Sequence, residues 1–215
     1  MHIPDGFLDP ITASITYLIT ITVLAISIYK VRGRLEERYA PIIGILAATI
    51  FVAQMLDWPI PGGTTAHFVG SALAVIIVGL YAGILIMSIV LFMQAVIFQD
   101  GGLTTLGANF LTMGIVGCVV GYLVFMLIMK KLNIKRKIFF AAFFAGWLSI
   151  TLAAFTCGLE IGFSTQFEYG VSVAVPAMTI WHAILGLLEG FITGVVVEYI
   201  YSLRPDIVLS VKGEG

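Results

Sequence analysis

The residues of this chain with the clearest capacity for chemistry are its three histidines, His2, His67 and His182. A histidine at position 2 is special because the amine of residue 1, the amide nitrogen of residue 2 and the imidazole can chelate one ion through fused rings. An α-amine has an ordinary pKa of about 7.7–8.0, so it gives up its proton to a metal readily at neutral pH. Loss of the amide proton favours ions that accept a square-planar nitrogen field, Ni(II) or Cu(II). Met1 and His2 would fill three corners of that square and His67 the fourth; the alternative is that His2 simply faces water.

A connection rich in Gly and Thr, residues 98–109, contains three side chains that could form hydrogen bonds around a bound ion: Gln99, Asp100 and Asn109. This stretch could line or close a site, because binding residues often lie on loops held by a rigid scaffold. The alternative is that it only turns the chain, with Thr and Asn capping the next helix. Both interpretations stay open.

His182 and Glu189 are seven residues apart and therefore lie on one face of a predicted helix. Ionisable residues inside a membrane segment indicate a function by default, and His182 is a candidate to support the ligands from nearby. The alternative is a satisfied pair that holds helices in register. Glu189 lies about 20 Å along the helix from Pro176, which is too deep for it to bind an ion at the outer edge.

The elements that position these residues must be membrane-spanning helices. Of the 215 residues, 60% are apolar and 11% are charged, and the mean hydropathy is +1.09. Ordinary globular domains are ~45–50% apolar and ~25% charged, so too little polar surface remains here for a water-soluble globule. The same figures exclude a disordered chain, a nucleic-acid-binding protein and a small disulfide scaffold. Cys118 and Cys157 fall within predicted spans and are interpreted as buried small apolar residues.

The apolar runs predict an all-α bundle of seven transmembrane helices that forms a single domain, residues 1–215. A helical span needs roughly 20 apolar residues to cross ~30 Å of hydrocarbon. The run from His67 to Phe98 is too long for one span and is interrupted at Gly79–Gly83, so we expect a hairpin of two short helices there. A candidate metal-binding segment, residues 1–9, precedes the first span. The expected spans cover about residues 11–29, 40–56, 67–80, 83–98, 108–129, 138–159 and 176–201.

Charge placement predicts the orientation in the membrane. All 11 Lys and Arg residues fall in three clusters, within residues 30–38, 130–137 and 204–212. The positive-inside rule puts all three clusters in the cytoplasm, which requires four spans between the first two. The N-terminus is therefore expected outside and the C-terminus in the cytoplasm, with the three histidines in the outer half. No basic region precedes the first span, so it does not resemble a cleavable signal peptide.

Three motifs resemble one family, the substrate-binding (S) component NikM/CbiM of nickel/cobalt energy-coupling-factor (ECF) transporters. They are MHIPDGFL at the N-terminus, GGTTAHFVGSAL at residues 62–73 and GGLTTLGANFLTMG at residues 101–114. In that family the N-terminal amine and amide and histidine side chains hold the ion. Carried over to this chain, the resemblance implies Met1, His2 and His67 as the metal ligands.

The resemblance also implies partners and a location. Family members work in the prokaryotic cell membrane with a transmembrane coupling protein and two cytoplasmic ATPases, and often with a small extra membrane subunit. This sequence has no GxxxxGK[ST] pattern and few residues in predicted cytoplasmic segments, so ATP hydrolysis must come from partners and the chain is not expected to be an enzyme. It ends soon after the last predicted span, so we expect any accessory subunit to be a separate chain.

The expected substrate is Ni²⁺, because a square of four nitrogens suits Ni(II) better than Co(II). A cobalt-specific S component is the alternative within the family, and a vitamin-binding S component, which would leave His2 idle, is another. An intramembrane metalloprotease is disfavoured by the lack of an HExxH motif. A channel would need polar residues through the membrane centre, where Glu189 is nearly alone.

Overall fold

The computed structural model describes residues 1–33, 39–131 and 135–212, which are mainly helical. The expected all-α class is confirmed. The elements in chain order are α1 (Pro10–Val31), α2 (Ala40–Gln54), β1 (Trp58–Pro59), β2 (Thr65–Ala66), α3 (Ser71–Val78), α4 (Leu80–Met93), η2 (Gln94–Phe98), α5 (Leu106–Asn109), η3 (Phe110–Gly117), α6 (Cys118–Lys131), α7 (Lys137–Phe163), α8 (Val171–Leu203) and α9 (Leu209–Lys212).

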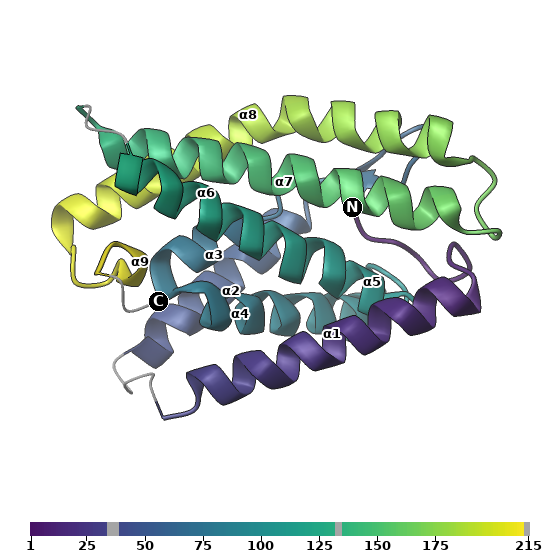
Figure 1. Ribbon diagram of the computed structural model, residues 1–215, viewed down its shortest axis with the longest axis horizontal. Coiled ribbons are helices and arrows are strands. Elements are labelled where there is room, and N and C mark those ends of the chain that lie inside the picture. Colours follow the sequence, from purple (N-terminus) through teal and green to yellow (C-terminus); the bar gives the residue numbers. More distant parts are fainter. Residues whose placement is uncertain (34–38, 132–134, 213–215) are drawn as a thin grey trace.

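The described helices form an elongated bundle (Figure 1). In the described residues, seven helical segments run from α1 to α8, since α4 continues into η2 and α5 continues through η3 into α6, and the short α9 follows them. Five of the described segments are long and apolar enough to cross a membrane: α1, α4 with η2, α5 through α6, α7, and α8. The shorter apolar helix α2 and the central helix α3 account for the two remaining helices of the seven that were expected. The membrane bundle is therefore confirmed, whereas its inside–outside orientation stays a prediction.

Within the third predicted span, residues 67–80, helix α3 covers only Ser71–Val78, and Leu80 already begins α4. Eight residues rise only about 12 Å, less than half of the hydrocarbon thickness. Gly70 has a φ of 79°, in the left-handed region, and this conformation ends any helix that would start earlier. The expected span is therefore wrong in its first part: an extended segment enters the bundle and a short helix continues it. All eight residues of α3 are buried.

Two π-helical stretches, η2 and η3, interrupt the long helices near the N-terminal segment. π turns are wider than α turns and occur frequently at functional sites. Gln94 opens η2 and Asn109 directly precedes η3. Both side chains contact the first three residues of the chain, as described below.

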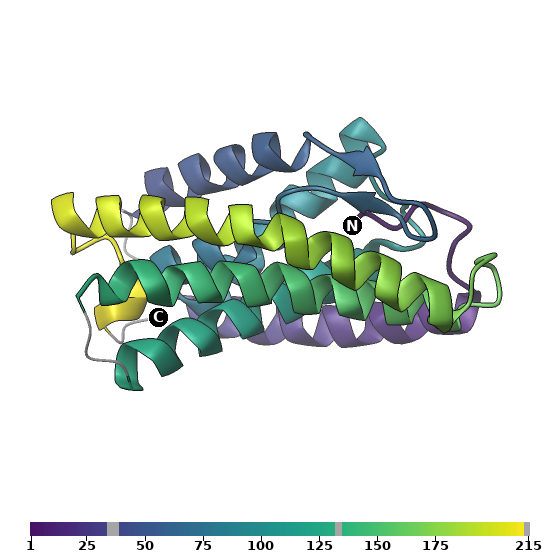
Figure 2. The same cartoon turned by 90° about the horizontal axis from the view of Figure 1, so that it is seen from above.

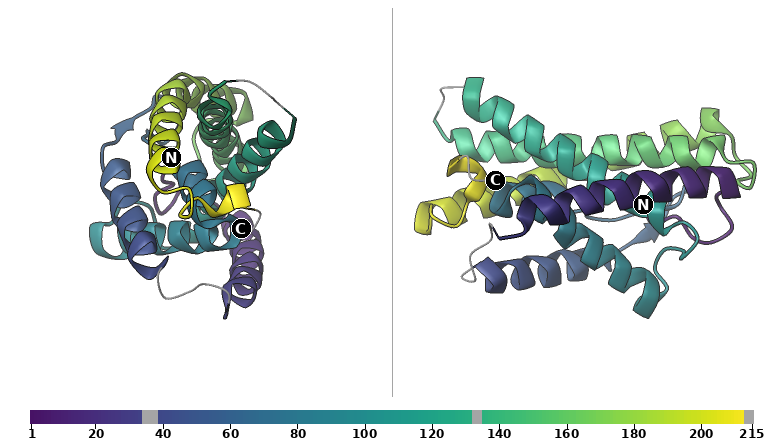
Figure 3. Two further views of the ribbon diagram at one scale, coloured as in Figure 1. Left: turned by 90° about the vertical axis from the view of Figure 1, so that its left-hand side faces the viewer. Right: turned by 60° about the horizontal axis from the view of Figure 1, so that its bottom comes forward.

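Close packing of α7 against α8 forms one wall of the bundle, where the two helices run side by side (Figures 1 and 2). Small residues allow this approach: a Cβ at Gly190 would lie 2.5 Å from the carbonyl oxygen of Phe143, and one at Gly158 would lie 2.8 Å from Cα of Val175. This use of small residues between helices is typical of membrane bundles. By contrast, α1 lies at the edge of the bundle (Figure 3), with most of its apolar surface exposed.

A two-stranded hairpin and the N-terminus lie together in one half of the bundle, toward the end where α7 connects to α8 (Figure 2). Strand β1 pairs antiparallel with β2, and Trp58 lies opposite Ala66. Non-helical backbone at membrane depth is tolerated where protein buries it or where it lines a cavity. The hairpin and the segment that follows it, residues 67–70, therefore need polar partners inside the protein.

Candidate metal centre

The first three residues are buried inside the bundle: Met1, His2 and Ile3 are at most 4% exposed. Asn109 holds this segment through both backbone groups of Ile3. Its Oδ1 accepts the Ile3 amide proton at 2.8 Å, and its Nδ2 donates to the Ile3 carbonyl at 3.1 Å. Gly102 N–H donates to the same carbonyl at 2.9 Å. The expected connection at residues 98–109 therefore holds the N-terminal segment in place.

The amine of Met1 lies against β2. It donates to the carbonyl oxygen of Thr65 at 2.5 Å and to its Oγ1 at 2.9 Å. Burial lowers the pKa of this amine from 8.0 to about 5, with Cys157, Asp100 and Asp57 opposing the shift only in part. At neutral pH the amine is therefore uncharged and has a lone pair to offer.

The imidazole of His2 stacks on that of His67, with ring centroids 4.5 Å apart and planes inclined by 14°. Its Nε2 lies 3.2 Å from Oε1 of Gln94, and its Nδ1 lies 3.1 Å from Oδ1 of Asp100. Partial burial alone would raise the pKa of Asp100, but the hydrogen bond and the charge of His2 outweigh it and the pKa is lowered. Asp100 is therefore an ionised carboxylate beside the ring.

The side chain of His67 is fully buried, two residues after the carbonyl that holds the amine. Its Nδ1 lies 2.7 Å from the carbonyl oxygen of Phe68. A carbonyl only accepts hydrogen bonds, so Nδ1 carries the proton and Nε2 carries the lone pair. Within the described chain this Nε2 has no hydrogen-bond partner. A buried, unpaired imidazole nitrogen is suited to bind a metal.

His182 reaches the same region from α8. It is fully buried, and its Nδ1 lies 2.7 Å from the carbonyl oxygen of Met178 one turn earlier. Its Nε2 is likewise unpartnered among the residues described. The ring interacts electrostatically with the Met1 amine. The N-terminal segment, the segment after β2 and helix α8 thus each bring one histidine to the region of the N-terminal amine.

Of the residues expected around the ligands, Asp100, Asn109 and His182 lie in this cluster, and Gln99 does not. Gln99 has a φ of 55° where the chain reverses after η2, and its side chain is exposed. Gln94, five residues earlier, contacts His2 instead. Because Gln94 is polar within an otherwise apolar run, its residue type was a usable signal that the sequence reasoning missed.

Side chains alone do not make a metal site here. In residues 1–33, 39–131 and 135–212, no group of three or more His, Cys, Asp or Glu side chains is placed to hold an ion. An ion in this cluster would need the main-chain nitrogens of residues 1 and 2. The His2 amide N–H donates no hydrogen bond within these same stretches, so its nitrogen is not committed elsewhere. The cluster can therefore offer an amine, an amide and imidazoles: a donor set made of nitrogen.

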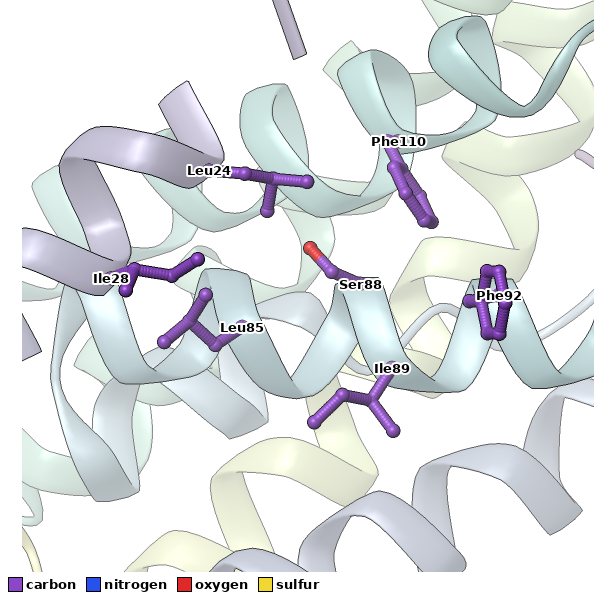
Figure 4. A pocket seen from close by; sticks show the side chains of 7 residues that line it. All are labelled: Leu24, Ile28, Leu85, Ser88, Ile89, Phe92 and Phe110. Carbon is purple, nitrogen blue, oxygen red and sulfur yellow. The ribbon is translucent and has the colours of Figure 1, made fainter. Parts of the chain in front are cut away.

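A separate groove on the side of the bundle has a different character. It has a volume of about 390 Å³ and lies between α1, α4 and η3 (Figure 4). Its one hydroxyl, on Ser88, donates to the carbonyl of Ile84. No ionisable side chain lines it, so it offers no ligand for an ion. The lining residues are Leu24, Ile28, Leu85, Ser88, Ile89, Phe92 and Phe110.

Comparisons with known proteins agree over nearly the whole chain. A family model described as CbiM, cobalt uptake substrate-specific transmembrane region, matches residues 2–207. A putative fused nickel transport protein NikMN from Archaeoglobus fulgidus is 53% identical over 97% of this chain and 68% of its own length. A putative metal transport protein from Haloquadratum walsbyi is 43% identical over 98% of this chain and 94% of its own. A crystal structure of a transition metal transporter superposes with a TM-score of 0.90 at 34% identity, covering 98% of this chain and 96% of that one.

Proposed function

This chain belongs to the CbiM/NikM family of substrate-binding components of nickel/cobalt ECF transporters, and from that premise we propose that its substrate is Ni(II), bound by Met1, His2 and His67. It is accordingly a multi-pass membrane protein of a prokaryotic uptake transporter and not an enzyme. The observation that carries the proposal is the burial of the Met1 amine, held by Thr65, in one cluster with the stacked rings of His2 and His67.

The proposed ligands are the Met1 amine, the His2 amide nitrogen, His2 Nδ1 and His67 Nε2. The first three belong to adjacent parts of the chain, so they close fused chelate rings around the ion. His67 supplies a nitrogen whose lone pair is fixed by the hydrogen bond of its Nδ1 to Phe68. Four nitrogens in a square favour Ni(II) among the transported candidates. Cu(II) would bind such a set more tightly still, so its exclusion must rest on access or availability.

Charge balance supports an ion in this buried place. A divalent cation brings two positive charges, and burial of unpaired charge is costly. The ionised amide of His2 supplies one negative charge and the carboxylate of Asp100, 3.1 Å from the His2 ring, supplies the other. The loaded site would then be neutral overall. Asp100 thereby compensates the ion without being one of its ligands.

Co(II) is the second candidate substrate. The family model is named for cobalt uptake, whereas the relative from Archaeoglobus fulgidus is named for nickel. Co(II) generally tolerates more varied coordination than a square. The Nε2 of His182, which has no hydrogen-bond partner among the described residues, would suit an additional ligand.

The proposed partners are a transmembrane coupling protein and two cytoplasmic ATPases of an ECF transporter. The fused relative is longer than the region that it shares with this chain, which supports a role for an accessory subunit as well. ATP hydrolysis and release of the ion to the cytoplasm are then tasks of the assembled complex. Binding of the ion is the task of this chain.

Metal analysis and optical spectroscopy of the purified protein test the proposed substrate. Protein supplied with equal nickel and cobalt should retain one nickel per chain and show the d–d absorption of square-planar Ni(II). Retention of cobalt alone would assign the alternative substrate. Retention of neither ion would overturn the proposed function.

A further inference from the structure

The backbone that carries His67 is attached to α8 by a buried carboxylate. Glu189, 1% exposed, accepts hydrogen bonds from two consecutive amides: Val69 N–H at 2.8 Å on Oε2 and Gly70 N–H at 2.9 Å on Oε1. These amides directly precede α3. N–H groups at the start of a helix have no partner within the helix. Glu189 therefore satisfies both of them from a different helix.

Two further helices fix the same segment. Gln54, the last residue of α2, donates from Nε2 to the carbonyl of Val69 at 2.6 Å. Ser71 donates from Oγ to the carbonyl of Met113 in η3 at 2.7 Å. Gly70 is confined as well, because a Cβ there would lie within about 3 Å of Phe68 and Ile50. The segment therefore has little freedom to shift while these contacts persist.

We propose that Glu189 is a positioning residue for the metal ligand His67, which rests on the proposed function of the site. His67 is separated from Val69 by a single residue, so the two bonds to the carboxylate fix where its imidazole is presented. Only a carboxylate side chain offers two equivalent acceptor oxygens to two converging N–H groups. Without it, two buried donors lose their partners, and the segment must move to recover them. That movement carries His67 away from the N-terminal chelate.

A double-mutant cycle between residues 67 and 189 tests this inference, with Ni(II) titrations of full-length protein in detergent. Glu189→Gln keeps the size of the side chain but replaces one acceptor oxygen with a donor. It should weaken Ni(II) binding ~10–100-fold, the usual effect of residues that orient a metal ligand. In a His67→Ala background, where the amino-terminal chelate binds alone, the same change should alter affinity less than twofold. Additive losses would mean that Glu189 does not act through His67, and would overturn the proposal.

Free imidazole provides a readout that a general loss of stability would not move. If Glu189→Gln misplaces His67, one corner of the square is open, and millimolar imidazole should strengthen Ni(II) binding. Wild type should not respond, and His67→Ala should respond in the same sense as Glu189→Gln. A Glu189→Gln protein that ignores imidazole would contradict the inference.

Thr193 provides a matched control. It is a buried polar residue on α8 one turn beyond Glu189, and its hydroxyl has no partner in the described part of the chain. Thr193→Val should leave Ni(II) affinity within twofold; a loss equal to that of Glu189→Gln would overturn the inference. If Glu189→Gln does not fold, Glu189→Asp, which retracts the carboxylate by one methylene, takes its place in the cycle. Wild-type protein that binds no Ni(II) would refute the proposed function itself, a separate result.

Discussion

Two of the proposed ligand nitrogens, the Met1 amine and His67 Nε2, are held by their neighbours in a form that can accept a metal. The hydrogen bond from His67 Nδ1 to the carbonyl of Phe68 leaves Nε2 unprotonated. Burial keeps the Met1 amine uncharged, with a pKa of about 5. A nitrogen must lose its proton before it can bind a metal. Because these nitrogens carry no proton on the lone pair that binds, the ion does not have to displace one.

Replacement of His67 and of His182 should distinguish a metal ligand from a residue that only lies beside the ion. We expect His67→Ala to remove high-affinity Ni(II) binding, with a loss greater than ~100-fold, because it deletes a coordinating nitrogen. His182→Ala should weaken binding by no more than ~10–100-fold, as is typical of residues beside a metal. Calorimetric titration of both variants measures the difference. Equal losses would mean that the fourth ligand has been misassigned.

Proton release should report the state of the Met1 amine. In a free peptide of sequence MHIPDGFL the amine keeps its ordinary pKa near ~8, so at pH 7 it must lose a proton to bind Ni(II). In the protein the pKa is about 5, so the amine has no proton to lose until the pH falls toward that value. The protein should thus release about one proton fewer from its amine per ion at pH 7, and the amine should oppose binding only near pH 5 and below. Calorimetry in buffers of different ionisation enthalpy counts these protons. A Met1 amine that NMR shows to be protonated at pH 7 in the protein would contradict the lowered pKa.

At the scale of elements, the N-terminal segment depends on the helix that begins at Leu106. Asn109 holds Ile3 through both its backbone groups. Asn109→Ala should leave those groups without their partner, release the segment and weaken Ni(II) binding ~10–100-fold. Acetylation of the Met1 amine by an activated ester should be slow in wild type and faster in this variant. An unchanged acetylation rate together with unchanged affinity would show that Asn109 does not hold the segment.

Much of this arrangement could be predicted from residue types and hydropathy, because polar residues are scarce in an apolar chain. His2, His67, Asp100 and Asn109 stood out for that reason. Contacts made by main-chain atoms leave no such signal: Thr65 binds the amine mainly through its carbonyl. Hydropathy likewise predicted a helix that starts at residue 67, since it does not register the left-handed conformation at Gly70 that delays α3.

Glu189 illustrates a second limit of sequence reasoning. Its depth along α8 made it unsuitable as a ligand for an ion at the outer edge. The remaining interpretation from the sequence was a pair with His182 that holds helices in register. In the structure its carboxylate contacts the amides before α3. Its partners are backbone groups more than a hundred residues away in the chain, and no residue pattern identifies such a pair.

At the scale of the whole molecule, the helix ends that carry described basic residues gather at one end of the bundle (Figure 1). The helix ends that carry them, the ends of α1, α6 and α8 and the start of α7, lie together on the left of Figure 1, and the N-terminus lies away from them. This is the arrangement that the positive-inside rule requires of a protein with its metal site on the outer side.

Labelling of introduced cysteines in intact cells tests the predicted orientation. Pro61, exposed in the hairpin near the metal centre, should be reached from outside, and Lys135, exposed between α6 and α7, only from the cytoplasm. A membrane-impermeant maleimide should therefore label Pro61→Cys in intact cells and Lys135→Cys only after lysis. Cys118 and Cys157 are buried and should stay unlabelled. Labelling of both sites from the same side would refute the seven-span topology.

The central claim is that the ion is bound by the amine, the amide and the imidazole at the start of the chain. One added residue before Met1, or acetylation of its nitrogen, would remove the amine ligand or change the ring sizes without altering any helix. Titration of Ni(II) into native, N-acetylated and one-residue-extended protein, with a C-terminally tagged protein as control, is the most direct test. High affinity should persist in the native and C-terminally tagged forms and disappear in the other two. Unchanged affinity in the extended protein would contradict the claim.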